Sequence, residues 1–275
     1  MAEIVAAFGM PHNPGSPALV ARDGPQCETA RFYAEMARHI EAVAPDVLLI
    51  FTDDHFNTFF LDNFPTFAIG IADATAGPND QTPMPHYKVA VPGALAAHIR
   101  TSALERGFDL SLAQDFDVDH AVMVPLHFLT PDMRIPVLPV FINCLAPPLP
   151  QARRCFALGE AVRAAVESWP QNERVAVIGS GSFSLEIGGP KIPIGDRAAC
   201  TPDPQWSQHV QDLLAQVRIG DLIAESTEAR MLQAGNIGGE LLNWIAMLGV
   251  VGARKPVTML PQNDHGQAFA AWLCN

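Results

Sequence analysis

The sequence predicts an α/β fold: one large domain over residues 1–275, with a mixed, largely parallel central sheet flanked by helices. Two observations predict it. Short apolar runs typical of buried strands alternate with longer segments whose apolar residues recur at helical spacing. In addition, 49% of the residues are hydrophobic and only 17% are charged, so the chain can bury a substantial core. We find no internal repeat and no low-complexity linker that would divide it.

The first half has a rhythm of strand, helix and strand, which favours parallel strand neighbours. We expect buried strands at residues 4–9, 46–52, 66–72 and 135–141. A helix is expected at 29–43, because Phe32, Met36, Ile40 and Val43 share one face, and another at 93–105.

The second half begins after a Pro-rich stretch at residues 146–150 and is richer in predicted helices. We expect helices at 152–168, 205–217, 221–234 and 236–248, a buried strand at 174–179, a short strand near Val257 and an apolar segment at 268–273. The 24 prolines and 20 glycines imply many irregular loops, which is where binding sites tend to lie.

Charge and cysteine usage exclude several classes of function. Lys and Arg number 17 against 29 Asp and Glu, a net charge of −12, so nothing general in the charge favours binding to nucleic acid or to an anionic membrane. No apolar run approaches the ~18 residues of a membrane span. The five cysteines form no CxxC pair, and the start of the chain lacks the features of a signal peptide. We therefore expect a cytoplasmic protein with reduced thiols.

Three residues stand out as candidates for chemistry. His12 and His55 each follow a predicted strand, and Glu240 lies in the first turn of a predicted helix. Ligands in open α/β sheets collect at the carboxyl ends of the strands, and two imidazoles with one carboxylate form the facial set of non-haem Fe(II) oxygenases. Each residue also has a simpler interpretation: a histidine after a strand is usually a loop or capping residue, and an early helical acid commonly stabilises the helix dipole. Spacing alone does not show that the three converge.

Several motifs, in order along the chain, connect it to a known family. They are PTFAIG at 65–70, DVDH at 117–120 with VPL at 124–126, RCFALG at 154–159 with RAAVES at 163–168, and GEL at 239–241 followed by Trp244. Over almost its whole length the chain resembles the class III extradiol dioxygenases, and in particular the catalytic β subunit of protocatechuate 4,5-dioxygenase.

This resemblance implies an activity and a site. The domain would be an extradiol dioxygenase that opens a catechol-type ring and adds both atoms of O2 to it. It implies that Fe(II) is the cofactor, that His12, His55 and Glu240 are its ligands, and that His120 faces substrate and oxygen without binding the metal. It further implies that the small aromatic substrate contacts Asn263 and the position of Leu185.

One position departs from the family pattern. The family has a base histidine where this chain has Leu185, and leucine cannot accept a proton. Two residues could replace the base: Glu186, if it points inward, and His265, which lies in the family's substrate-contacting loop. We favour His265, although a solvated loop histidine is an equally ordinary interpretation of it.

The altered base leaves alternatives open. The substrate could be an aminophenol or a more oxygenated ring instead of a simple catechol. The chain could also be a metal-dependent enzyme of another reaction type, or a non-catalytic partner of an active paralogue, since fold alone does not fix function. In the family a small α subunit caps the pocket, so we expect either such a subunit or a homo-oligomer.

Overall fold

The computed structural model describes residues 1–187 and 201–274, and it confirms the predicted fold class. In the described part, eight strands form one mixed sheet in the order β6-β3-β7-β2-β8-β1-β10-β9. The strands are β1 (Glu3–Met10), β2 (Val47–Thr52), β3 (Phe67–Gly70), β6 (Ser111–Ala113), β7 (Val137–Ile142), β8 (Arg174–Ser180), β9 (Thr258–Gln262) and β10 (Gln267–Leu273). A separate hairpin consists of β4 (Ala74–Gly77) and β5 (Tyr87–Ala90).

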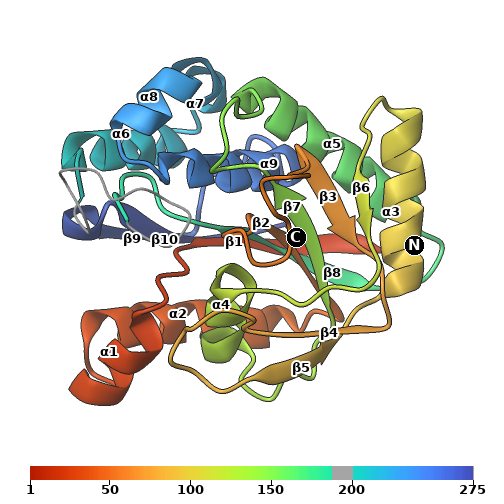
Figure 1. The fold of residues 1–275 in the computed structure, drawn as a ribbon, viewed down its shortest axis with the longest axis horizontal. Helices are drawn as coiled ribbons and strands as arrows, with labels where there is room; N and C mark the ends of the chain where they lie inside the picture. Colours follow the sequence, from red (N-terminus) through yellow and green to blue (C-terminus); the bar gives the residue numbers. More distant parts are fainter. Residues whose placement is uncertain (188–200, 275) are drawn as a thin grey trace.

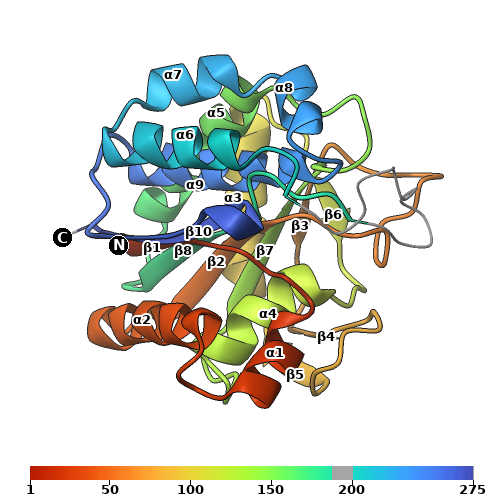
Figure 2. The same ribbon diagram turned by 90° about the vertical axis from the view of Figure 1, so that its left-hand side faces the viewer.

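Helices cover both faces of the sheet. Figure 2 shows α1, α2, α4 and the β4–β5 hairpin on one side, and the remaining α-helices on the other. The helices are α1 (Ser16–Asp23), α2 (Glu28–Val43), α3 (Gly93–Glu105), α4 (His120–Leu129), α5 (Ala152–Ser168), α6 (Pro204–Ala215), α7 (Ile219–Glu225), α8 (Glu228–Gln233) and α9 (Leu241–Val251), with 3-10 turns η1 (Gly238–Glu240) and η2 (Asn263–His265). Each face therefore buries its own apolar cluster against the sheet.

The centre of the sheet is parallel, and this fixes where a site can form. β7, β2, β8 and β1 are neighbours in that order and run parallel, whereas β10 and β9 are antiparallel at one edge. β2 is buried along its whole length, as expected for a strand covered on both faces. Because the carboxyl ends of β1, β8 and β2 lie at the same sheet edge, the residues that follow them are brought together (Figure 1).

Helix α9, which follows Glu240, is held close to α5 by two glycines. A Cβ on Gly159 would lie 1.9 Å from the carbonyl oxygen of Ala246, and one on Gly249 would lie 2.1 Å from that of Phe156. Backbone cannot give way as a flexible side chain can, so only glycine permits this approach. The start of α9 is thereby fixed relative to the sheet.

Two helix predictions were partly wrong. The segment predicted as one helix at 221–234 is two helices, because Thr227 caps a new one: its side chain accepts a hydrogen bond from the backbone N–H of Arg230. The helix predicted at 236–248 begins as the 3-10 turn η1 and becomes α-helical only at Leu241.

Five elements, α1, α4, β4, β5 and β6, were not expected from the sequence. Helix α4 was missed because Pro125 lies inside it, and proline usually ends a helix. The missed strands have only three or four residues, too few to show a period.

Two expectations from composition can be compared with the structure. None of the helices in the described ranges has the length and apolarity that a membrane span needs. The cysteines within those ranges, Cys27, Cys144, Cys155 and Cys274, are all free thiols, and Cys200 lies outside them.

Candidate metal centre

The three predicted ligands come from three different elements and converge. His12 lies two residues after β1, His55 three residues after β2, and Glu240 at the end of η1. The Nε2 atom of His12 is 3.3 Å from Oε1 of Glu240, and Nε2 of His55 is 3.7 Å from the same oxygen. All three side chains are buried, with no more than 7% of any of them exposed. The structure thus brings the trio together, and their role as ligands stays a prediction.

Asp53 is a fourth member of this cluster, and the sequence analysis missed it. One nitrogen or oxygen from each of His12, Asp53, His55 and Glu240 lies within 4.8 Å of the others. Asp53 directly follows β2, at the same sheet edge as His12, so its position after the strand could have pointed to it.

Two buried oxygens in the cluster have no hydrogen-bond partner among the described residues. They are Oε1 of Glu240 and Oδ2 of Asp53, and both side chains are 0% exposed. A buried carboxylate oxygen without a partner is costly unless a cation compensates it. The donor set, imidazole nitrogen with carboxylate oxygen, suits Fe(II) or Zn(II). The residues present therefore fit a divalent metal ion.

The orientation of His12 is set from helix α4. Nδ1 of His12 lies 2.9 Å from the hydroxyl oxygen of Ser180, and that hydroxyl donates to the carbonyl oxygen of Ala121 at 2.8 Å. Ala121 is four residues before Pro125, which has no N–H, so its carbonyl lacks the usual helical donor. The Ser180 hydroxyl donates its only hydrogen to the carbonyl oxygen of Ala121. It therefore accepts the hydrogen bond that it shares with Nδ1 of His12. In the neutral imidazole, Nε2 of His12 is then unprotonated, and it faces Glu240.

His55 is oriented by Asp119, the N-cap of α4. Oδ2 of Asp119 accepts hydrogen bonds from the backbone N–H of His55 at 2.8 Å and from its Nδ1 at 3.0 Å, while Oδ1 accepts from the backbone N–H of Ala121. Nε2 of His55 is therefore also free to bind a metal. A carboxylate or hydroxyl behind a ligating imidazole is the usual arrangement in protein metal sites.

The third group, Glu240, is held by the loop that follows β8. Its Oε2 accepts a hydrogen bond of 2.7 Å from the backbone N–H of Ser182, which leaves Oε1 directed at the histidines. Gly181 makes this approach possible: its φ is +151°, and a Cβ there would lie 2.5 Å from Cβ of Glu240. Gly181 thus has both a positive φ and a close contact with Glu240, and each of these favours glycine over any other residue.

His120 borders the cluster on the side away from the carboxylates. Its ring stacks on that of His55 at a centroid distance of 4.3 Å, and it can form a three-histidine group with His12 and His55. No group among the described residues combines His120 with Glu240 or Asp53. Nδ1 of His120 makes a short hydrogen bond to Oδ2 of Asp80, so Nε2 is the nitrogen left for other contacts. Because His120 also belongs to a group that could hold a metal ion, its non-ligating role stays a prediction.

The charges in the cluster are strongly coupled. Burial alone would raise the pKa of Glu240, but the adjacent His12 and His55 outweigh it and lower the pKa to about 2. Burial would lower the pKa of both histidines, and the neighbouring carboxylates outweigh it and raise the pKa of each. Burial, assisted by His55, lowers the pKa of His120. Protons on His12 and His55 and a bound cation are therefore alternative ways to compensate the same carboxylates.

The residues proposed for substrate contact and for the base are less well placed. His265 is exposed in η2, and its role as the replacement base stays a prediction. The amide of Asn263 is engaged by α6: its Oδ1 accepts from Gln211 and its Nδ2 donates to Gln208, both at 2.5 Å. One donor and one acceptor site of the amide remain, so the contact of Asn263 with substrate stays a prediction.

Leu185, at the family's base position, and its neighbour Glu186 differ in burial. Leu185 is half-buried, and its contact with substrate stays a prediction. Glu186 is buried, and its carboxylate accepts a hydrogen bond of 2.9 Å from the backbone N–H of Asn236. That bond gives Glu186 a structural role in holding the loop before η1.

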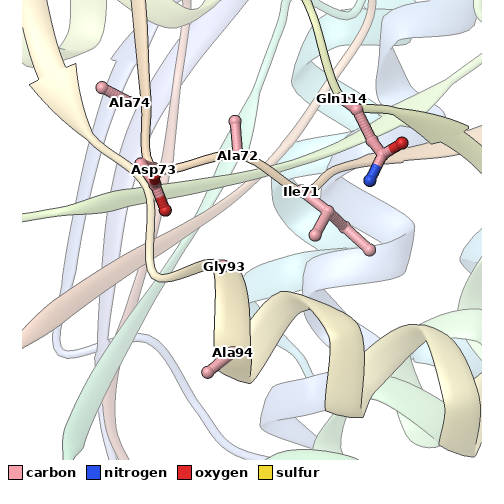
Figure 3. A pocket seen from close by; sticks show the side chains of 7 residues that line it. All are labelled: Ile71, Ala72, Asp73, Ala74, Gly93, Ala94 and Gln114. Atoms are coloured by element: carbon pink, nitrogen blue, oxygen red, sulfur yellow. The ribbon is translucent and has the colours of Figure 1, made fainter.

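A shallow depression between β3 and the start of α3 is a separate feature (Figure 3). Among the residues that line it, Asp73 and Gln114 are the polar side chains, and neither histidine nor cysteine is present. It therefore lacks the imidazole groups that allow the histidine–carboxylate cluster to bind a metal ion.

Comparison with known proteins gives one family match and several relatives. The family model described as the catalytic LigB subunit of aromatic ring-opening dioxygenase matches residues 6–271. A 2,3-dihydroxyphenylpropionate/2,3-dihydroxicinnamic acid 1,2-dioxygenase from Klebsiella pneumoniae subsp. pneumoniae is 30% identical, covering 82% of each chain. The protein of that name from Burkholderia vietnamiensis is also 30% identical, covering 94% of this chain and 89% of its own.

A solved structure supports the fold alone. The crystal structure of an uncharacterized protein from Escherichia coli K12, JW3007, aligns with a TM-score of 0.57 at 15% identity. The alignment covers 97% of this chain and 99% of the other.

The hydrogen bond behind His12 can be tested with a matched pair of variants. Ser180→Ala removes the acceptor that fixes the protonation of His12, so we expect metal affinity to fall about 10–100-fold, as for other groups that orient metal ligands. Ser184→Ala removes another fully buried hydroxyl, from the loop that follows β8, and this hydroxyl donates to the carbonyl oxygen of Ala234. Competition with a chelator measures both, and equal affinities in the two variants would refute the role of Ser180.

Proposed function

Since the chain belongs to the family of catalytic LigB subunits of aromatic ring-opening dioxygenases, we propose that it is an Fe(II)-dependent extradiol dioxygenase that opens a catechol-type ring with O2. The observation that carries the proposal is the convergence of His12, His55 and Glu240 around a buried carboxylate oxygen that has no hydrogen-bond partner in the described chain. The names of the relatives make catechols with a carboxylate-bearing side chain the first substrates to try.

The protein's own residues divide into ligands and groups that orient them. His12, His55 and Glu240 would hold the ion, while Ser180 and Asp119 keep the imidazole protons on the outer nitrogens. The bound metal would supply a positively charged centre that acidifies the diol and brings it next to O2. Burial of the cluster excludes bulk water, which strengthens each electrostatic interaction within it.

His120 would transfer protons from and to the substrate. Asp80 holds Nδ1, so a neutral His120 presents an unprotonated Nε2 on the side of the cluster away from the carboxylates. Nε2 can take a proton from a diol hydroxyl and return it when the ring opens, in the manner of a histidine backed by an aspartate. With Leu185 at the family's base position and His265 exposed, His120 is the imidazole best placed for both steps.

The cellular setting and the assembly are also proposals. Free thiols at the four described cysteines fit the expected cytoplasmic location. A small α-type subunit or a second copy of the chain would cover the open side of the site, and sedimentation of the purified protein would distinguish the two.

The metal ligands can be tested by substitution. The wild-type protein, loaded anaerobically with Fe(II), is mixed with catechols, gallates and aminophenols, and O2 uptake and ring-opened product are followed together. We expect turnover of at least one catechol, and loss of both iron and turnover in His12→Ala, His55→Ala and Glu240→Ala. His98→Ala is the control, because His98 contacts the end of α5 and should leave both unchanged.

Other outcomes of this experiment would contradict the proposal in distinct ways. Full iron occupancy in any of the three ligand variants would remove that residue from the site. Iron binding with turnover of a different kind would indicate another metal-dependent reaction. An iron-free wild-type chain that binds an active paralogue would indicate a non-catalytic partner.

Variants of His120 and Asp80 test the proposed proton transfer separately from metal binding. His120→Ala should keep its iron and lose turnover by about 10²–10⁴-fold, the usual contribution of a general acid–base group. Asp80→Asn should keep iron as well, and it should shift the pH profile of kcat/KM, because Asp80 fixes the proton on His120. Unchanged O2 uptake in His120→Ala with the best substrate would exclude the role.

A further inference from the structure

Asp53 has the properties of a metal ligand, although it is not one of the three that the family resemblance implies. It is 0% exposed, and its Oδ2 has no hydrogen-bond partner in the described part of the chain. That oxygen lies 3.7 Å from Nε2 of His55, the nitrogen that faces the cluster. An unpaired carboxylate oxygen so close to a metal-binding nitrogen is directed at the place where the ion would lie.

The other oxygen of Asp53 is held from the opposite side. The side-chain amide of Asn243, in α9, donates to Oδ1 of Asp53 at 3.1 Å and to the carbonyl oxygen of Ser180 at 2.8 Å. Asn243 is itself 0% exposed. A fully buried amide therefore fixes the carboxylate with Oδ2 toward the cluster, as is usual for a group that orients a metal ligand.

The four candidate ligand atoms all lie within 4.8 Å of one another, and three of their six spacings can be compared with those around a single ion. With metal–ligand bonds of about 2.1 Å, neighbouring ligand atoms are about 3.4 Å apart in a tetrahedron and about 3.0 Å apart in an octahedron. The distances in the cluster are 3.3 Å between His12 and Glu240, 3.7 Å between His55 and Glu240, and 3.7 Å between His55 and Asp53. All three are closer to the tetrahedral spacing.

Charge balance favours the same assignment. Two neutral imidazoles and one carboxylate leave a divalent ion with a net charge of +1, whereas Asp53 brings the sum to zero. Neutrality matters here because the cluster is buried, where an uncompensated charge of either sign is costly.

We propose that Asp53 is a fourth protein ligand to the divalent ion in the substrate-free enzyme, together with His12, His55 and Glu240. The inference rests on the proposed metal-dependent function.

The test compares Asp53→Asn with the wild-type protein, using Fe(II), Zn(II) and Co(II) as probes. Asparagine has the same shape but no charged oxygen, so the fold should persist, and thermal unfolding of the metal-free proteins checks this. We expect affinity, measured by chelator competition, to fall at least about 10-fold. Visible absorption of the Co(II) protein should also weaken, since four-coordinate Co(II) absorbs far more strongly than six-coordinate Co(II). Glu186→Gln neutralises another buried carboxylate, one that binds a backbone N–H, and should behave as wild type.

The possible outcomes separate this inference from the proposed function. Unchanged affinity and an unchanged Co(II) spectrum in Asp53→Asn would overturn the fourth ligand, while loss of metal in His12→Ala would still support the proposed function. Weaker affinity with an unchanged spectrum would place Asp53 outside the metal sphere and also overturn it. A wild-type protein that binds none of the three ions would overturn both.

Discussion

The structure is organised around buried carboxylates that need a positive charge. Glu240 and Asp53 are completely buried, and one oxygen of each has no hydrogen-bond partner among the residues described. The protein offers two imidazoles as neighbours and no described lysine or arginine in ion-pair contact with either carboxylate. Such an arrangement is costly in an empty fold and favourable around a divalent cation. The surrounding elements can be understood as supports that hold these groups in place.

Each support depends on a local feature of the sequence. Parallel β1, β8 and β2 end at one edge, which brings His12, Ser180 and Asp53 together. Pro125 frees the carbonyl oxygen of Ala121 to orient Ser180 and, through it, His12. On the other side, Gly159 lets α9 approach α5 and so fixes the start of that helix, which directly follows Glu240. The metal centre is thus specified by residues on both faces of the sheet.

Much of this could be predicted from the sequence, and the reasons for the rest are physical. The unbroken apolar run of β2 and the helical spacing of the apolar residues in α5 are clear signals, so both elements were predicted closely. Position after a strand indicated His12 and His55, but their convergence with Glu240 depends on contacts between residues far apart in the chain. Asp53 was missed because a carboxylate two residues before His55 looks like an ordinary loop residue until its burial is known. The exposure of His265 likewise follows from tertiary packing and not from its motif.

The central claim is that buried negative charge makes this site require a divalent cation, and thermal unfolding tests it most directly. The metal-free protein would be unfolded anaerobically at rising concentrations of free Fe(II), beside Glu240→Gln. We predict that Fe(II) stabilises the wild-type protein, by about 2.7 kcal/mol at 100 times its Kd, and raises its Tm accordingly. Glu240→Gln should gain little at the same concentrations. A wild-type Tm that does not change with Fe(II), or an equal gain in Glu240→Gln, would contradict the account.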